Sequence, residues 1–268
     1  MLSARPAHET KHISLLPYPF LSSSFSLLQL DDGRSNGTAL WLGAQCLSLF
    51  LVQLYSRPKS VSTARPRALE LGSGIGLSAL ALASIGWDVL ATDTTHVISS
   101  TLSNNVTTNS AHLPLLSGDI QVRELDWTVP PDNWNWQHPV SIASHSFPLT
   151  PEDTATSALR PPFDLIISSD TLYTSQLVQP LFRTLHAAAS RSLTPSGRSV
   201  PVYLCIERRD SDLIDKALAD AQHIWGFSVD RIPHRKVVKA MEKGGLKWSP
   251  DQWDGVEIWK LQLKKTTA

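Results

Sequence analysis

The sequence has little that would place the protein outside the cell, in a membrane or on a nucleic acid. Only two of its 268 residues are cysteines, too few for a disulfide framework, which favours an intracellular location. Its 24 basic and 24 acidic side chains balance, so charge gives no sign of general nucleic-acid affinity. The longest apolar stretch, about residues 40–54, is interrupted by Gln45, Ser48 and Gln53 and is too short and polar to span a membrane. We expect a cytoplasmic location that also extends to the nucleus, because the N-terminus shows no signal-peptide pattern.

Two common kinds of site are also missing from the sequence. The nine histidines and two cysteines form no cluster with metal-ligand spacing, so we predict no metal. No Gly-Lys-Ser/Thr triplet follows the glycine-rich segment, which argues against a phosphate-binding P-loop. Apolar residues make up 42% of the chain, enough to bury a sizeable core.

The best-defined pattern that is present is an apolar run that ends in a glycine-dense turn. Gly72, Gly74 and Gly76 follow residues 67–71, and an alanine- and leucine-rich segment comes next. Glycine lets the backbone turn sharply and lets a ligand approach it closely. A second apolar run then ends at Asp93. This order predicts the first β-α-β unit of a nucleotide-type site, with an acid placed to bind ribose hydroxyls.

The residues around the turn indicate which ligand to expect. The glycines do not follow the Gly-x-Gly-x-x-Gly spacing of dinucleotide enzymes. Glu70, two residues before the first glycine, would repel a pyrophosphate but would suit a cationic ligand. S-adenosylmethionine carries an ammonium and a sulfonium, and Asp93 suits its ribose. The alternative is that Glu70 and Asp93 are ordinary acids at strand ends.

The rest of the chain alternates predicted strands and helices, which indicates an α/β fold with a doubly wound sheet. Residues 1–36 are predicted to form an N-terminal β-hairpin extension, with a turn at Asp31-Asp32-Gly33 and with Pro17 and Pro19 breaking its first strand. Residues 37–268 form the main domain, which opens with a helix that Thr38 caps. Residues 128–162 are proline-rich and predict a mobile surface insertion. The final strands should form an antiparallel hairpin at the edge of the sheet.

Four segments together resemble a known family. Residues 70–76, 92–93, 124–127 and 164–173 look like the seven-β-strand methyltransferases of family 16, which are protein-lysine methyltransferases similar to the methyltransferase-like 21 and 22 proteins and their fungal counterparts. The Asp170-x-x-Tyr173 motif narrows the resemblance to this group. It covers about residues 37–263 and implies a Rossmann-like class I methyltransferase sheet of seven strands with helices on both faces.

The resemblance implies S-adenosyl-L-methionine as cofactor and assigns residues to it. It places Asp93 at the ribose, Trp127 beside the adenine with Asp126 near its amino group, Trp41 over the methionine end, and Ser169 next to the cofactor. The alternative for Trp41 is a core anchor, and for Trp127 an aromatic residue at a strand end. The full predicted cofactor-binding set is Trp41, Glu70, Gly72, Ser73, Gly74, Asp93, Asp126, Trp127 and Ser169.

Asp170 and Tyr173 are the predicted catalytic residues. They follow the end of a predicted strand, where open α/β sheets place their sites. Asp170 would attract a lysine ammonium and Tyr173 would form an aromatic wall or a hydrogen bond. The alternative is a helix N-cap and a packed tyrosine. Glu207 could help bind a basic peptide, although a salt bridge with Arg208 or Arg209 is the favoured interpretation.

Three functions remain open on the sequence. The first is a protein-lysine N-methyltransferase acting on an intracellular protein, for which the resemblance implies translation factors, ribosomal proteins or chaperones. The second is a small-molecule, nicotinamide-type N-methyltransferase, and the third is a non-catalytic binding module on the same fold. In each case we expect a monomer without membrane or direct nucleic-acid partners.

Overall fold

A central eight-stranded sheet organises the structure, a computed structural model that describes residues 4–30, 36–56, 64–146, 157–194, 196–197 and 199–264. The strands stand in the order β6-β5-β4-β3-β7-β8-β10-β9. All neighbours are parallel except β10, which is antiparallel to both β8 and β9. The strands are β3 (Arg67–Leu71), β4 (Asp88–Asp93), β5 (Ile120–Leu125), β6 (Ser141–Ala143), β7 (Leu165–Ser169), β8 (Val202–Glu207), β9 (Phe227–Arg231) and β10 (Val256–Leu263).

The strand order confirms the doubly wound α/β prediction. From β3 the chain builds outward through β4, β5 and β6, then returns to the other side of β3 and continues through β7 and β8. This reversal is the switch point at which open α/β sheets form ligand-binding crevices. The last two strands form the predicted antiparallel pair. Seven strands were expected, and the short β6 adds an eighth at the edge.

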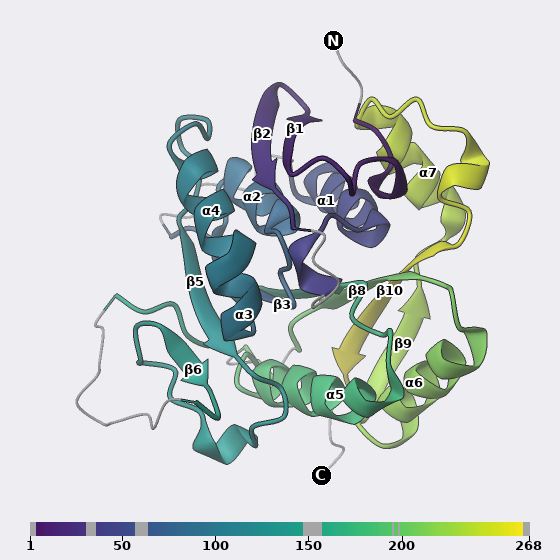
Figure 1. The fold of residues 1–268 in the computed structure, drawn as a ribbon. Coiled ribbons are helices and arrows are strands. Elements are labelled where there is room, and N and C mark those ends of the chain that lie inside the picture. Colours follow the sequence, from purple (N-terminus) through teal and green to yellow (C-terminus); the bar gives the residue numbers. More distant parts are fainter. Residues whose placement is uncertain are drawn as a thin grey trace.

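Helices cover both faces of the sheet (Figure 1). Alternate strand residues point to opposite faces, so Ala68 joins one apolar cluster and Leu69 the other. The first cluster contains residues of α1 (Leu42–Tyr55), α2 (Leu77–Ser84), α4 (Ser103–Ser110) and α7 (His234–Lys243). The second contains residues of α5 (Ser175–Ser190) and α6 (Ser211–His223). Helix α4 is preceded without a break by α3 (Thr95–Val97) and a π-helical turn at Ile98–Leu102.

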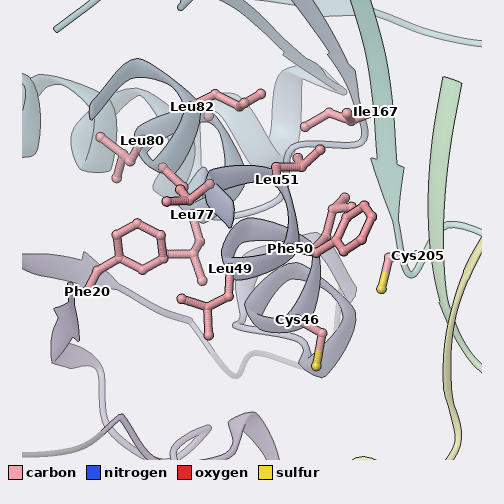
Figure 2. Packing of buried hydrophobic residues seen from close by; sticks show 14 of the residues in the cluster. Phe20, Cys46, Leu49, Phe50, Leu51, Leu77, Leu80, Leu82, Ile167 and Cys205 are labelled. Atoms are coloured by element: carbon pink, nitrogen blue, oxygen red, sulfur yellow. The ribbon is translucent and has the colours of Figure 1, made fainter. Parts of the chain in front are cut away.

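The predicted N-terminal hairpin is present, but its turn and strand limits differ from the prediction. It consists of β1 (Leu15–Phe20) and β2 (Ser23–Leu28), joined at residues 21–22, whereas the predicted turn at Asp31-Asp32-Gly33 lies outside the described residues. Pro17 and Pro19 do not break β1, because among the described strands it pairs with β2 alone, and its other edge needs no N–H donors there. Figure 2 shows Phe20 in the same apolar cluster as residues of α1 and α2.

The start of α1 differs from the prediction that Thr38 caps it. The helix begins at Leu42, and Thr38 lies in a preceding 3-10 turn, where its hydroxyl donates to the carbonyl of Leu30 over 2.8 Å. Trp41 occupies the N-cap position without a side-chain cap bond. The start of this helix is therefore set by tertiary contacts around Trp41 and Gly43.

The proline-rich insertion is more ordered than predicted over its described part. Residues 147–156 of it lie outside the described residues. The remainder includes β6 and packs around Arg123, a fully buried side chain that donates to the carbonyls of Trp136, His138 and Leu159. Burial lowers the pKa of Arg123 to about 10. The described part is otherwise irregular, as a loop was predicted to be, and β6 and the contacts of Arg123 were not expected because long-range hydrogen bonds leave no hydrophobic periodicity.

Candidate functional site

A cavity open to solvent lies at the switch point, against the carboxyl ends of β3, β4 and β7. Nine of the residues predicted from the sequence line it, drawn from separate segments of the chain. They are Trp41, Gly72, Ser73, Gly74, Asp93, Trp127, Ser169, Asp170 and Tyr173.

The glycine turn forms the floor of this cavity. Gly72, Gly74 and Gly76 all have positive φ, at 69°, 55° and 88°, which side chains rarely adopt. A Cβ at Gly72 would lie 2.7 Å from Thr171 Cγ2 and 3.3 Å from the Trp127 ring. Glycine is therefore required at this position both for the conformation and for the space in front of β7.

Asp93 closes the turn from the end of β4. Its carboxylate accepts the Gly74 amide over 2.9 Å and the Thr94 amide over 2.8 Å. Burial raises the pKa of Asp93 to about 6, and the two amides oppose that rise by favouring the charged form. The carboxylate is therefore fixed in orientation at the wall of the cavity before any ligand binds.

Two residues predicted to bind the cofactor, Glu70 and Asp126, do not line the cavity. Glu70 is 1% exposed beneath the turn, where burial raises its pKa to about 8 against the opposing effect of Ser73 and Ser78. Asp126 accepts hydrogen bonds from the Thr128 amide and hydroxyl over 2.9 and 2.6 Å. The structure thus gives Glu70 a place under the turn and Asp126 a place in the loop after β5.

Trp41 separates the first cavity from a second one. Its indole N–H donates to the carbonyl of Asn36, and its ring lines both cavities. Two cations contact this ring: Lys11 Nζ lies 3.6 Å from the ring centroid and the Arg209 guanidinium 4.6 Å. Trp41 is thus a cavity wall held in place by polar and cationic contacts rather than a core anchor.

Asp170 lies where the two cavities meet. Its φ is +54°, and its Oδ1 accepts the Glu207 amide over 3.3 Å. Burial raises the pKa of Asp170 to about 6, the nearby Glu207 adds to the rise, and the backbone of Glu207 and Gly43 opposes it. Oδ2 is buried without a hydrogen-bond partner among the described residues. Asp170 is not the N-cap of the next helix, because Thr174 holds that position for α5.

The second cavity is lined by acidic, aromatic and aliphatic side chains. Its residues are Asn36, Trp41, Asp170, Leu172, Tyr173, Ile206, Glu207, Arg209 and Asp210. Glu207 forms the favoured salt bridge, with Arg209 as its partner. Arg208 instead pairs with Glu257 and Asp215. Tyr173 is 53% exposed and lines both cavities, so it marks an open rim that the two share.

Several cavity residues were not predicted. Thr171 and Thr94 each follow a predicted acidic site residue, so their position next to Asp170 and Asp93 was a usable signal. Asn36 and Ala39 come from the segment before α1. Nothing in the local sequence around these two indicates that the segment folds over the glycine turn.

The described residues hold neither a metal-binding cluster nor a membrane-spanning helix. They contain no group of three or more His, Cys, Asp or Glu side chains arranged to hold a metal ion. None of the helices in this part of the chain combines the length and apolar character that crossing a membrane requires.

Comparison with known proteins identifies relatives of the chain. A family profile described as lysine methyltransferase matches residues 23–143. Protein-lysine methyltransferase METTL21E of Mus musculus is 24% identical over 176 residues, which cover 64% of this chain and 60% of that protein. The alignment thus spans less than two thirds of that curated relative.

Solved structures also match the chain, at low sequence identity. A methyltransferase from Pyrococcus furiosus is 14% identical with a TM-score of 0.45, and the match covers 90% of each chain. The human methyltransferase 10 domain containing protein is 12% identical with a TM-score of 0.43, covering 82% of this chain and 81% of that one. The family match includes the glycine turn and Asp93, which form the first cavity. The sequence matches therefore show similarity to lysine methyltransferases over part of the chain, with the family profile covering just under half of it.

Proposed function

We propose that the protein is an S-adenosylmethionine-dependent protein-lysine N-methyltransferase. The observation that carries this proposal is the pairing of two cavities. One is built on the glycine turn and Asp93, the other is acidic, and both share Trp41, Asp170 and Tyr173. A cofactor and a cationic acceptor can therefore meet at these three side chains.

The residues of the first cavity fit the cofactor. The missing Cβ of Gly72 leaves the cavity floor open in front of Thr171, and the preoriented Asp93 carboxylate suits a ribose diol. Trp127 offers an aromatic wall for the adenine. S-adenosylmethionine, when bound, supplies a methyl group carried on a positively charged sulfur.

Asp170 and Tyr173 would hold the acceptor. Lysine is cationic near pH 7, and only its neutral amine has a lone pair that can accept a methyl group. With a pKa of about 6, Asp170 is mostly charged at pH 7 and attracts the ammonium. The aromatic rings of Trp41 and Tyr173 favour a cation between them. Positioning is the contribution of these residues, and the departing proton leaves to water through the open rim beside Tyr173.

A lysine in a protein is the favoured acceptor. The rim is open at Tyr173, which is half exposed, so a side chain can enter while its backbone stays outside. The relative METTL21E is named a protein-lysine methyltransferase, which supports this choice over a small-molecule acceptor. The choice among translation factors, ribosomal proteins and chaperones stays a prediction, as does a monomeric state.

Two substitutions with a matched control test the proposal. Asp93→Ala should weaken S-adenosylmethionine binding at least about tenfold, because a fixed carboxylate is lost. Asp170→Asn should keep cofactor binding but abolish methyl transfer to protein. Asp126→Ala removes a carboxylate outside the cavity and should change neither property. The measurements are calorimetry for binding and labelled-methyl incorporation into lysate proteins for transfer. Failure of the unsubstituted protein to bind the cofactor would refute the proposed function.

A further inference from the structure

Arg209 lines the second cavity and contacts two other lining residues. Its guanidinium is 4.6 Å from the centroid of the Trp41 ring and forms an ion pair with Glu207. Its positive charge also lowers the pKa of Asp170, against the larger effect of burial. An arginine of the chain itself thus stands in the space that the proposed function assigns to a substrate cation.

The surroundings of Arg209 are those of a cation-binding site. The side chains of Asp170, Glu207 and Asp210 line the cavity with Arg209 as the only basic residue among the described lining residues. Oδ2 of Asp170 is buried and accepts no hydrogen bond from the described residues. The described lining thus sets three acidic residues against one cation.

The contacts of the Arg209 side chain are weak enough for it to move from the second cavity into solvent. Its side chain is 56% exposed, and its ion pair involves a single carboxylate. Its neighbour Arg208 is only 22% exposed and is bound to both Glu257 and Asp215. Exposed single ion pairs contribute little to stability, so moving Arg209 into solvent costs far less than moving Arg208.

We propose that Arg209 occupies, in the free protein, the position that the substrate's ammonium takes, and that a lysine side chain must displace it to bind. This inference rests on the proposed function and adds a determinant of specificity to it. An incoming amine competes with an internal cation for Glu207 and for the face of Trp41. Amines that bind weakly cannot displace Arg209 and are rejected. A lysine displaces it when other parts of the substrate protein add binding affinity.

The test measures amine binding without any methyl donor. The probe is Nα-acetyl-lysine methylamide, titrated into protein with ¹⁵N-labelled tryptophan while the indole N–H signal of Trp41 is followed. The Trp41→Phe variant identifies that signal. Nα-acetyl-norleucine methylamide, which has no charge, serves as the control probe.

Removing the internal cation should strengthen binding of the lysine probe. Arg209→Gln loses one exposed ion pair and one cation–π contact, so the probe should bind roughly five- to thirtyfold more tightly. Arg209→Lys keeps a cation and should stay close to the unsubstituted protein. Arg231→Gln is the matched control, because Arg231 is 51% exposed and pairs with Glu257, and it should change nothing.

The possible failures can be told apart. Binding that is equal or weaker in Arg209→Gln, or an equal gain for the norleucine probe, would overturn the role of Arg209. Absence of a Trp41 response to the lysine probe in every variant would overturn it as well. The proposed function itself would be refuted by a different result, the failure of the protein to bind S-adenosylmethionine in calorimetry.

Discussion

Glu70 makes the stability of the fold depend on pH in a way that can be measured. Its carboxyl is 1% exposed, and burial raises its pKa from 4.5 to about 8. The folded protein therefore holds this proton more tightly than the unfolded chain does. It follows that the contribution of Glu70 to stability falls as the pH rises from about 4.5 to about 8, and is constant above that.

The magnitude follows from the two pKa values. Each tenfold change in proton affinity corresponds to about 1.4 kcal/mol. Relative to acid pH, Glu70 then lowers the free energy of unfolding by about 2 kcal/mol at pH 6 and by at most about 5 kcal/mol at pH 9. Between these two pH values the free energy of unfolding of the unsubstituted protein should fall by about 3 kcal/mol more than that of a variant with a neutral side chain at position 70.

Glu70→Gln is the substitution that tests this reasoning. Glutamine has nearly the same shape and cannot ionise, so Ser73 and Ser78 keep a partner. The assay is urea unfolding of both proteins at pH 6 and pH 9, followed by tryptophan fluorescence. Titratable groups that do not interact with Glu70 titrate in both proteins and cancel in the comparison. A difference in unfolding free energy that is the same at both pH values would refute the argument.

Two further predictions follow from other contacts. Gly43→Ala would place a Cβ 2.4 Å from Asp170 Oδ2 and so displace the carboxylate. The methylation rate at saturating cofactor should then fall about 100-fold. An unchanged rate would contradict the positioning role of Asp170. Asn105→Ala removes hydrogen bonds to the backbone of Leu28 and to the carbonyl of Ile75. The free energy of unfolding should fall by about 3 kcal/mol, and hydrogen exchange of the Leu28 amide should become faster. Unchanged exchange protection at Leu28 would count against this prediction.

The sheet and the floor of the first cavity were predictable because their signals are local. Apolar runs that end at Asp93 and Asp170 mark strand ends, and the glycines between them mark the turn. Parallel strands then bring these ends to one edge of the sheet. Neighbouring residues carry all of this information, so these features can be predicted from a single sequence.

Other features depend on contacts between distant segments and left no local signal. The start of α1 is set by Gly43 meeting Asp170, and the edge strand β6 has only three residues. Glu70 was predicted to face the ligand because it precedes the turn, yet it is buried beneath it. The salt bridge of Arg209 with Glu207 was anticipated, but its contact with Trp41 joins segments that the sequence does not show to be close.

The N-terminal hairpin has both of its edges blocked against strand addition. On β1, Pro17 and Pro19 remove two N–H donors from the outer edge. On β2, the amides of Asn105 and Asn109 each bond both the N–H and the C=O of one residue, Leu28 and Ser26 respectively. Residues four apart on a helix rise about 6 Å, close to the spacing of two residues along a strand, so α4 imitates a neighbouring strand.

An unprotected two-stranded ribbon invites pairing with a second molecule. Here the asparagine pair satisfies β2 from within the same chain, and the prolines make β1 a poor template. The hairpin can therefore lie over α1 and α2 near the site without recruiting other copies into a shared sheet. Loss of either asparagine should raise the tendency to self-associate during folding as well as lower stability.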